Sequence, residues 1–99
     1  MQNDRFLSSL GMARKANKVS LGYDKALEAI HKGVSQAVFV ACDISEKTKR
    51  GIEIAAEYDD VQVITVDYDI FAITNAIGTK TGIVSINDSG FAKKLISLI

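Results

Sequence analysis

The residues of this chain best placed to bind a ligand lie around a glycine between a short apolar run and an amphipathic segment. Gly22 follows the run Val19–Leu21, and the segment after it has helical periodicity as far as Gly33. The first backbone N–H groups of a helix have no partner within the helix, and the helix dipole adds positive potential there. The turn at Gly22 therefore predicts a seat for an anion such as a phosphate group.

Polar side chains surround this turn on both sides. Tyr23, Asp24, Lys25 and Glu28 follow Gly22 in the first turns of the predicted helix. Lys25 and Glu28 are three residues apart, so they could also pair with each other. The basic residues nearby are candidate phosphate contacts, which position a nucleic acid without reading its sequence. These residues are Arg14, Lys15, Lys18 and Lys32. Alternatively, they form a solvated surface that contacts no ligand.

The remaining reactive side chains do not indicate a catalytic centre. His31 lies just before Gly33, where a cation complements the helix dipole. Cys42 ends an apolar run and is expected to be an inert, buried thiol. No His/Cys cluster has metal-ligand spacing. The loop 78–82 lacks the GxxxxGK[ST] spacing of a nucleoside-triphosphate site. We therefore expect no enzyme activity, no metal and no cofactor.

The composition is that of an ordinary soluble globular protein. The chain has 99 residues, of which 47% are hydrophobic and 24% charged, enough for one core. This predicts a single domain over residues 1–99. No apolar run approaches the roughly 20 residues of a membrane span, and the N-terminus lacks the apolar region of a signal peptide. A single cysteine cannot form an internal disulfide, so a cytoplasmic location is expected. We also expect a monomer that does not contact membranes.

Charge is distributed unevenly, although the formal net charge is zero. Residues 1–50 hold nine Lys/Arg and five Asp/Glu, whereas residues 51–99 hold three Lys/Arg and seven Asp/Glu. The two halves therefore carry +4 and −4. A neutral total argues against strong non-specific binding of nucleic acid, which depends on overall positive charge. The asymmetry still allows a local basic face.

Hydrophobic periodicity predicts five helices that alternate with four strands. The helices are expected at about 3–16, at about 23–32, from a cap at Asp43 or Ser45 to about Tyr58, between a cap at Asp69 and Gly78, and after a cap at Asp88 or Ser89. The strands are expected at 19–21, 37–42, 62–66 and 83–86. On the first helix, the predicted inward positions are Phe6, Leu7, Leu10, Ala13 and Ala16. The alternation predicts a three-layer α/β/α sandwich with a mixed sheet of about four strands.

Five short segments, in this order, carry a resemblance to a known family. They are Leu10–Ala16 (LGMARKA), Gly22 with Gly33, Ala41–Ser45 (ACDIS), Ala76–Gly78 (AIG) and Gly90–Leu95 (GFAKKL). Their order and spacing over nearly the whole chain resemble the ribosomal protein L-seven-Ae family, and more closely its bacterial YlxQ-related branch. The resemblance implies RNA binding. The best-known members bind kink-turns, which are sharply bent helix–bulge–helix RNAs with tandem sheared G·A pairs.

The resemblance also implies where RNA would be read. Strong kink-turn binders of this family have a pattern similar to G-x-N-E-x-x-K at the start of the second helix. In this chain the pattern falls on Gly22, Asp24, Lys25 and Glu28, and only the glycine matches. Asp24 can accept a hydrogen bond from guanine but lacks the amide donor, and Lys25 replaces an acceptor with a donor. Glu28 places a carboxylate where the family often has a cation.

Two further segments correspond to the rest of the family's site. The loop of Thr79, Lys80 and Thr81 matches the family's loop that packs against a flipped-out nucleotide. Here it is short and polar, and Ile44 is the apolar candidate beside it. The resemblance therefore implies structured RNA as a partner, with ribosomal RNA, the ribosome and translation factors as expected contexts.

A second interpretation remains open at this point. The same fold could serve as a protein-interaction module that docks on a translation partner with weak or no RNA binding. The acidic second half of the chain would suit a basic protein.

Overall fold

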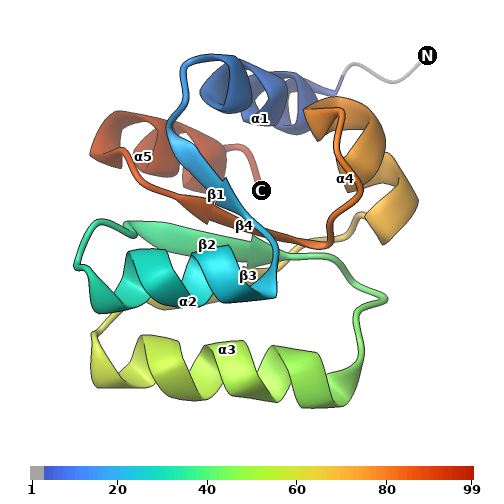
Figure 1. The fold of residues 1–99 in the computed structure, drawn as a ribbon. Helices are drawn as coiled ribbons and strands as arrows, with labels where there is room; N and C mark the ends of the chain where they lie inside the picture. The colour runs from blue at the N-terminus through green and yellow to red at the C-terminus, as the bar shows by residue number, and fades with distance from the viewer. Residues whose placement is uncertain (1–3) are drawn as a thin grey trace.

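The computed structural model describes residues 4–99, in which five helices alternate with four strands (Figure 1). The element types and their order confirm the sequence prediction. Residue 3, expected at the start of the first helix, lies outside the described residues. The elements are α1 (Arg5–Lys15), β1 (Val19–Leu21), α2 (Tyr23–His31), β2 (Ala37–Val40), α3 (Glu46–Tyr58), β3 (Gln62–Thr65), α4 (Ile70–Ile77), β4 (Ile83–Ile86) and α5 (Ser89–Ser97).

The four strands form one mixed sheet in the order β1-β4-β2-β3. Strand β4 lies antiparallel to both of its neighbours, pairing Val84 with Leu21 on one side and with Phe39 on the other. Strand β3 runs parallel to β2, with Val38 opposite Val63. The two edges of the sheet are therefore β1, from the first half of the chain, and β3, from the second half.

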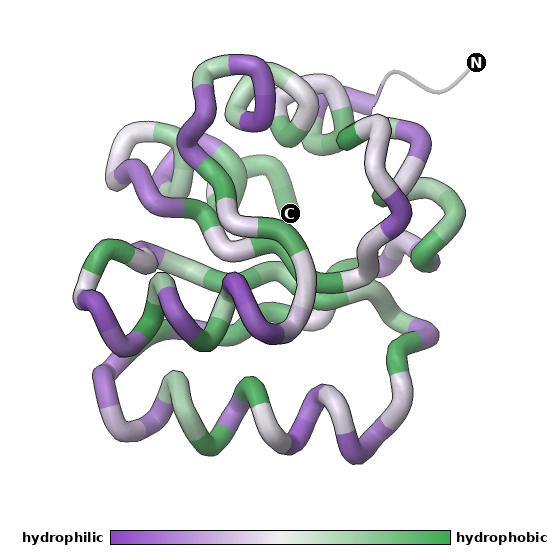
Figure 2. The backbone as a smooth tube through the Cα atoms, viewed as in Figure 1, coloured by the Kyte–Doolittle hydropathy of each residue, from purple (hydrophilic) through white to green (hydrophobic). Residues whose placement is uncertain are grey.

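Helices cover both faces of the sheet, as the alternation predicted. Figure 1 shows α1, α4 and α5 on one side and α2 and α3 on the other. Two apolar cores result. One joins α1, α4 and α5 to the sheet and centres on Phe39, Leu10 and Leu95. The other lies under α2 and α3 and includes Ile30 and Ile52. Figure 2 shows hydrophobic residues along the strands between these layers. Among residues 4–99, none of the helices is long and apolar enough to cross a membrane.

Side chains cap four of the five described helices at their N-termini. Asp4, Ser45, Asp69 and Asp88 each accept a hydrogen bond from the backbone N–H three residues later, at 2.8–3.1 Å. Ser45 thus caps α3, whereas Asp43 accepts from the N–H of Ile70 at 2.9 Å and so supports the start of α4. Helix α2 has no side-chain cap.

Two positions differ from the sequence prediction. Cys42 is exposed, not buried, because β2 ends at Val40 and the chain has already left the sheet. Ala16 is also exposed, because it is the C-terminal cap of α1 and lies beyond the inward stripe. In both cases the apolar run in the sequence continues past the end of the element.

A chain of polar side chains ties edge strand β1 to the interior of the sheet. Asn87 donates from Nδ2 to Ser20 Oγ at 2.8 Å, and Ser85 Oγ lies 2.8 Å from both Asn87 Oδ1 and Ser35 Oγ. Ser85 is fully buried, so these bonds satisfy a hydroxyl that water cannot reach. They fix β1, and with it the start of α2.

Candidate functional site

Three links between elements converge around the start of α2. They are the turn from β1, the link from β2 to α3 and the link from α4 to β4, which lie on the same side of the molecule in Figure 1. Together they line an open hollow of about 340 Å³. Five of the predicted site residues lie in its lining: Gly22, Tyr23, Ile44, Lys80 and Thr81.

Gly22 sets the direction in which α2 leaves the sheet. Its φ is 90° and its ψ is 170°, a conformation that side-chain-bearing L residues rarely adopt. A Cβ at this position would meet nothing within 4 Å, so the requirement for glycine comes from the backbone angle and not from lack of space. Its N–H donates to the carbonyl of Ile83 at 2.9 Å, which anchors the turn to β4.

The start of α2, which lines the hollow at Gly22 and Tyr23, has backbone N–H groups without a capping side chain. The first helical bond of α2 runs from the N–H of Ala26 to the carbonyl of Gly22 at 3.0 Å. The N–H groups of residues 23–25 precede that bond and have no side-chain acceptor at the cap. An anion placed there would receive hydrogen bonds and the favourable end of the helix dipole.

Tyr23 presents an aromatic ring beside these donors. Its side chain rests on α3 at Gly51, where an added Cβ would collide with the tyrosine hydroxyl. Gly51 therefore leaves the space in which the Tyr23 side chain packs against α3. Tyr23 is 39% exposed and lines the hollow with Ile44, so it offers a partly solvated aromatic edge or face.

A second hollow, of about 420 Å³, lies beside β1 and holds the other predicted side chains. Arg14, Lys25, Glu28 and Thr79 line it, together with residues of β1. Arg14 donates from Nη2 to Thr79 Oγ1 at 3.5 Å, so the end of α1 contacts the link between α4 and β4. We call Arg14, Lys18, Lys25 and Lys80, with the N-terminus of α2, the basic edge of the molecule.

Glu28 pairs with Lys32 and not with Lys25. Glu28 Oε2 lies 3.2 Å from Lys32 Nζ, one helical turn further along α2, and both side chains are more than half exposed. Solvated pairs of this kind contribute only a few tenths of a kcal/mol, about 0.3–0.5. Lys32 is the C-terminal cap of α2, at the opposite end from Gly22. The structure therefore separates Lys32 from the basic edge, in contrast to the prediction.

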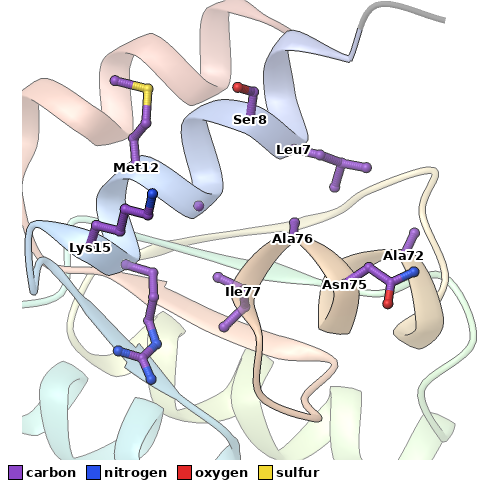
Figure 3. Close-up of a pocket in the computed structure, with 10 residues that line it drawn as sticks. Leu7, Ser8, Met12, Lys15, Ala72, Asn75, Ala76 and Ile77 are labelled. Atoms are coloured by element: carbon purple, nitrogen blue, oxygen red, sulfur yellow. The ribbon is translucent and has the colours of Figure 1, made fainter.

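Lys15 contributes to a different surface from the other predicted cations. It lines a groove of about 500 Å³ between α1 and α4, with Met12 and Asn75 (Figure 3). The helices approach closely there because α1 has Gly11, whose Cβ would lie 2.9 Å from the carbonyl oxygen of Ala76. Arg14 lines both this groove and the hollow beside β1. Lys18 is exposed at the entrance to β1.

Thr81 supports the site from inside the protein. Its side chain is buried, and its Oγ1 donates to the carbonyl of Ile83 at 2.9 Å and accepts from the N–H of Ile83 at 3.1 Å. Its own N–H donates to Thr74 Oγ1 at 3.2 Å. The expectation that the Thr81 hydroxyl contacts a ligand is therefore corrected. In this loop Thr79 and Lys80 are the exposed members.

The remaining reactive residues lie apart from the basic edge. His31 Nδ1 is 3.6 Å from Asp59 Oδ2 in the turn after α3. Among residues 4–99, no group of three His, Cys, Asp or Glu side chains is arranged to hold a metal ion.

Sequence reasoning missed several residues that line the two hollows. Asn17 has a left-handed φ of 60° and reverses the chain between α1 and β1. Asparagine is one of the few non-glycine residues that favour this conformation, so the Ala-Asn-Lys turn carried a usable signal. Asp43, in the link into α3, and Thr48, in the first turn of α3, also line the first hollow. The sequence marked Asp43 only as a possible helix cap, because the place of both residues depends on how α3 packs against α2.

Comparison with known proteins gives consistent results along the whole chain. Residues 4–96 match the model of the ribosomal protein L7Ae/L30e/S12e/Gadd45 family. The RNA-binding protein YlxQ of Enterococcus faecium is 32% identical over 96 residues, which cover 94% of this chain and 89% of that protein. The RNA-binding protein YlxQ of Bacillus subtilis (strain 168) is 31% identical over 91 residues, covering 91% and 90%.

Two solved structures share the fold. A protein with unknown function from Bacillus halodurans C superimposes with a TM-score of 0.91 at 25% identity, over 97% of both chains. The 15.5kD RNA binding protein of Giardia lamblia superimposes with a TM-score of 0.72 at 16% identity, over 100% of this chain and 94% of the other.

Proposed function

Because this chain belongs to the ribosomal protein L7Ae/L30e/S12e/Gadd45 family, we propose that it binds structured RNA through the basic edge. Its family and its named relatives are binding proteins, so the chain is a non-catalytic protein, as the sequence predicted. The proposal concerns its ligand. It is supported by the names of the two relatives, both RNA-binding proteins of similar length.

One structural observation carries the proposal: the uncapped N-terminus of α2 lies beside cations from other segments. Lys80, from the link into β4, lines the first hollow with Gly22 and Tyr23. Arg14 of α1 lines the second hollow with Lys25, and Lys18 is exposed where the chain enters β1. A phosphate at this position would accept hydrogen bonds from backbone N–H groups and be attracted by the nearby cations.

The same edge offers groups that contact bases. Tyr23 presents a ring on which an unpaired base stacks, an interaction of about 1–3 kcal/mol in single-stranded RNA complexes. Lys25 donates to base acceptors such as guanine O6 and N7, and Asp24 accepts from exocyclic amines. Ile44 and Ile70 provide the apolar lining of the hollow beside the ring.

The finer proposal is a preference for kink-turn RNA with modest affinity. Asp24 and Glu28 place two carboxylates close to the phosphate path, and the described structure neutralises only Glu28, through Lys32. A solvated like-charge contact costs on the order of 1 kcal/mol. We therefore propose recognition of a bent RNA shape by few contacts, in a ribosomal or translational setting in the cytoplasm.

A titration of the purified protein against a kink-turn RNA and a plain duplex, at two salt concentrations, tests this proposal. We expect tighter binding to the kink-turn. Each phosphate contact contributes a slope of roughly −0.9 in log K against log salt on the duplex scale, so a few contacts give a shallow dependence. Equal, weak binding to both RNAs would contradict the kink-turn preference, and no binding to either would contradict RNA binding itself.

A further inference from the structure

The opposite edge of the sheet, strand β3, has unused backbone hydrogen-bonding groups. The N–H of Val66 donates to the carbonyl of Val40 at 2.9 Å, so the main chain of residues 62, 64 and 66 faces β2. Because these groups alternate along a strand, those of Val63 and Thr65 face away from β2. No strand pairs with β3 on that side within residues 4–99. An extended segment could pair there by strand addition.

The surface beside this strand is a hollow between β3 and α3, of about 390 Å³. Its apolar floor contains Val61 and Val63, and Glu53 and Glu57 of α3 line its wall. Arg50 is the one basic residue among the side chains that line it. A segment added to β3 would therefore lay side chains against two carboxylates and two valines.

The charge around this hollow is net negative. Its lining contains Glu53 and Glu57 with one cation, Arg50. Asp59 and Asp60 form the turn into β3, and Asp59 contacts His31. Glu53, Glu57 and Asp60 have no ion-pair partner in the part of the chain that the structure describes. We call β3, these two glutamates and the two aspartates of the turn the acidic edge.

The charge also indicates which partner fits. A second copy that paired β3 with β3 would bring two acidic edges together, and like charges placed side by side disfavour that contact. RNA is excluded for the same reason. A segment with Lys or Arg beside β-branched residues would complement both the carboxylates and the valine floor. Tyr58, which is 88% exposed at the end of α3, adds an aromatic contact near the start of the strand.

We propose that the acidic edge is a docking site for an extended basic segment of a partner protein, which adds a strand to β3. The site is separate from the basic edge and independent of RNA binding. The protein would then join an RNA on one edge of its sheet to a basic protein on the other.

The test uses a capped synthetic peptide of alternating lysine and valine, with a matched glutamate–valine peptide as control. We expect the lysine peptide to bind and to slow hydrogen exchange at the N–H groups of Val63 and Thr65, as measured by NMR. Two protein variants separate the two parts of the site. E53K combined with E57K reverses the wall charges, and Thr65→Pro removes an outward N–H.

Proline is tolerated on an edge strand when the lost N–H faces outward, so Thr65→Pro is expected to fold. Thr65→Val keeps the N–H and is its matched control. E46K reverses one glutamate of α3 outside the hollow, half of the charge change in E53K/E57K, and controls for added positive charge on this helix. We expect about tenfold weaker peptide binding in E53K/E57K and in Thr65→Pro, and wild-type peptide binding in both controls. If Thr65→Pro does not fold, the glutamate variant still decides the question.

Three results would overturn the proposal. They are equal binding of the glutamate peptide, unchanged lysine-peptide binding in E53K/E57K, and exchange protection elsewhere than β3. Protection of Val63 and Thr65 without peptide that rises with protein concentration would instead identify a second copy as the occupant. RNA titrations of E53K/E57K keep the two proposals apart, because RNA affinity is expected not to fall when the acidic edge is altered.

Discussion

The two edges of the sheet differ in charge, in strand pairing and in what they leave exposed. Strand β1 pairs antiparallel with β4 and lies beside Arg14 and Lys25 and the open start of α2. Strand β3 pairs parallel with β2 and lies beside Glu53 and Glu57. One edge thus offers a helix N-terminus and cations to an anionic ligand. The other offers carboxylates and unpaired strand groups to a cationic segment.

The comparison explains how a protein of zero net charge carries cations along one edge of its sheet and carboxylates along the other. The sequence is basic in its first half and acidic in its second half. The strand order places β1 from the first half and β3 from the second half at opposite edges. Fold topology therefore converts a charge difference along the chain into a charge difference across the molecule.

Reversing the cations of the basic edge should have the largest effect on this comparison. For Arg14→Glu combined with Lys25→Glu, we expect about 100-fold weaker RNA binding, because two attractive contacts become repulsive. The salt slope should become shallower by roughly 0.9 per lost phosphate contact. Filter binding or fluorescence anisotropy at two salt concentrations measures both quantities.

The matched control changes two exposed cations on α5. Lys93→Glu with Lys94→Glu alters the net charge by the same amount away from either edge. An equal loss of RNA affinity in this control would show that overall charge, and not the basic edge, attracts RNA.

Replacing the glycine that starts α2 should weaken both the fold and the site. Gly22→Ala forces a side-chain-bearing residue to a φ of 90°, which costs about 1–3 kcal/mol of unfolding free energy. Chemical denaturation measures that loss. The folded fraction should also bind RNA less well, because the turn no longer aims the α2 donors.

Gly33→Ala is the control for this variant. Its φ of 79° also favours glycine, but it follows the far end of α2. We expect destabilisation with unchanged RNA affinity of the folded protein. Weaker RNA binding by Gly33→Ala would show that Gly22 acts only through stability.

Replacing Glu28, a carboxylate beside the cations of the basic edge, should increase the charge difference between the two edges. For Glu28→Lys we expect RNA affinity to rise by about three- to tenfold, because a repulsive charge becomes attractive and the lost pair with Lys32 is weak. RNA titration at low salt measures the gain. Glu57→Lys makes the same charge change at the acidic edge and should not reproduce it. No gain for Glu28→Lys would place the phosphate path elsewhere.

The smallest expected effect concerns Tyr68, which lines a hollow next to the end of β3 with Asp67. Burial, the hydrogen bond from its hydroxyl to Asp4 Oδ1 at 3.0 Å, and the charges of Asp4 and Asp67 raise its pKa above the ordinary value of 10.0. The folded state therefore favours the protonated hydroxyl of Tyr68. The contribution of this preference to folding stability is present below pH 10.0 and is lost as the pH rises through the folded-state pKa.

NMR titration of the Tyr68 ring tests this prediction. We expect a midpoint above 10.0, and a lower one in Asp67→Asn because one nearby negative charge is removed. Tyr68→Phe should reduce the loss of stability at high pH. An unchanged midpoint in Asp67→Asn would show that the charge of Asp67 does not affect the pKa of Tyr68.

The sequence by itself determined the local structure of this protein. Periodicity, glycines and capping residues act over a few neighbours, so all nine elements were predictable, as were the left-handed glycines after α2 and α4. The glycine turn at Gly22, from which α2 starts, was predictable for the same reason. The errors lay at element ends, where Cys42 and Ala16 extend an apolar run beyond the hydrogen-bonded structure.

Only the tertiary structure decided which distant residues meet. The order β1-β4-β2-β3, the contact of Arg14 with Thr79 and the seat of Tyr23 on Gly51 join segments far apart in the sequence. Likewise, Thr81 turns inward because of partners in β4 and α4. Strand pairing and helix packing depend on burying surface over the whole chain, which local patterns do not encode. The contrast between a basic and an acidic edge arises at that level.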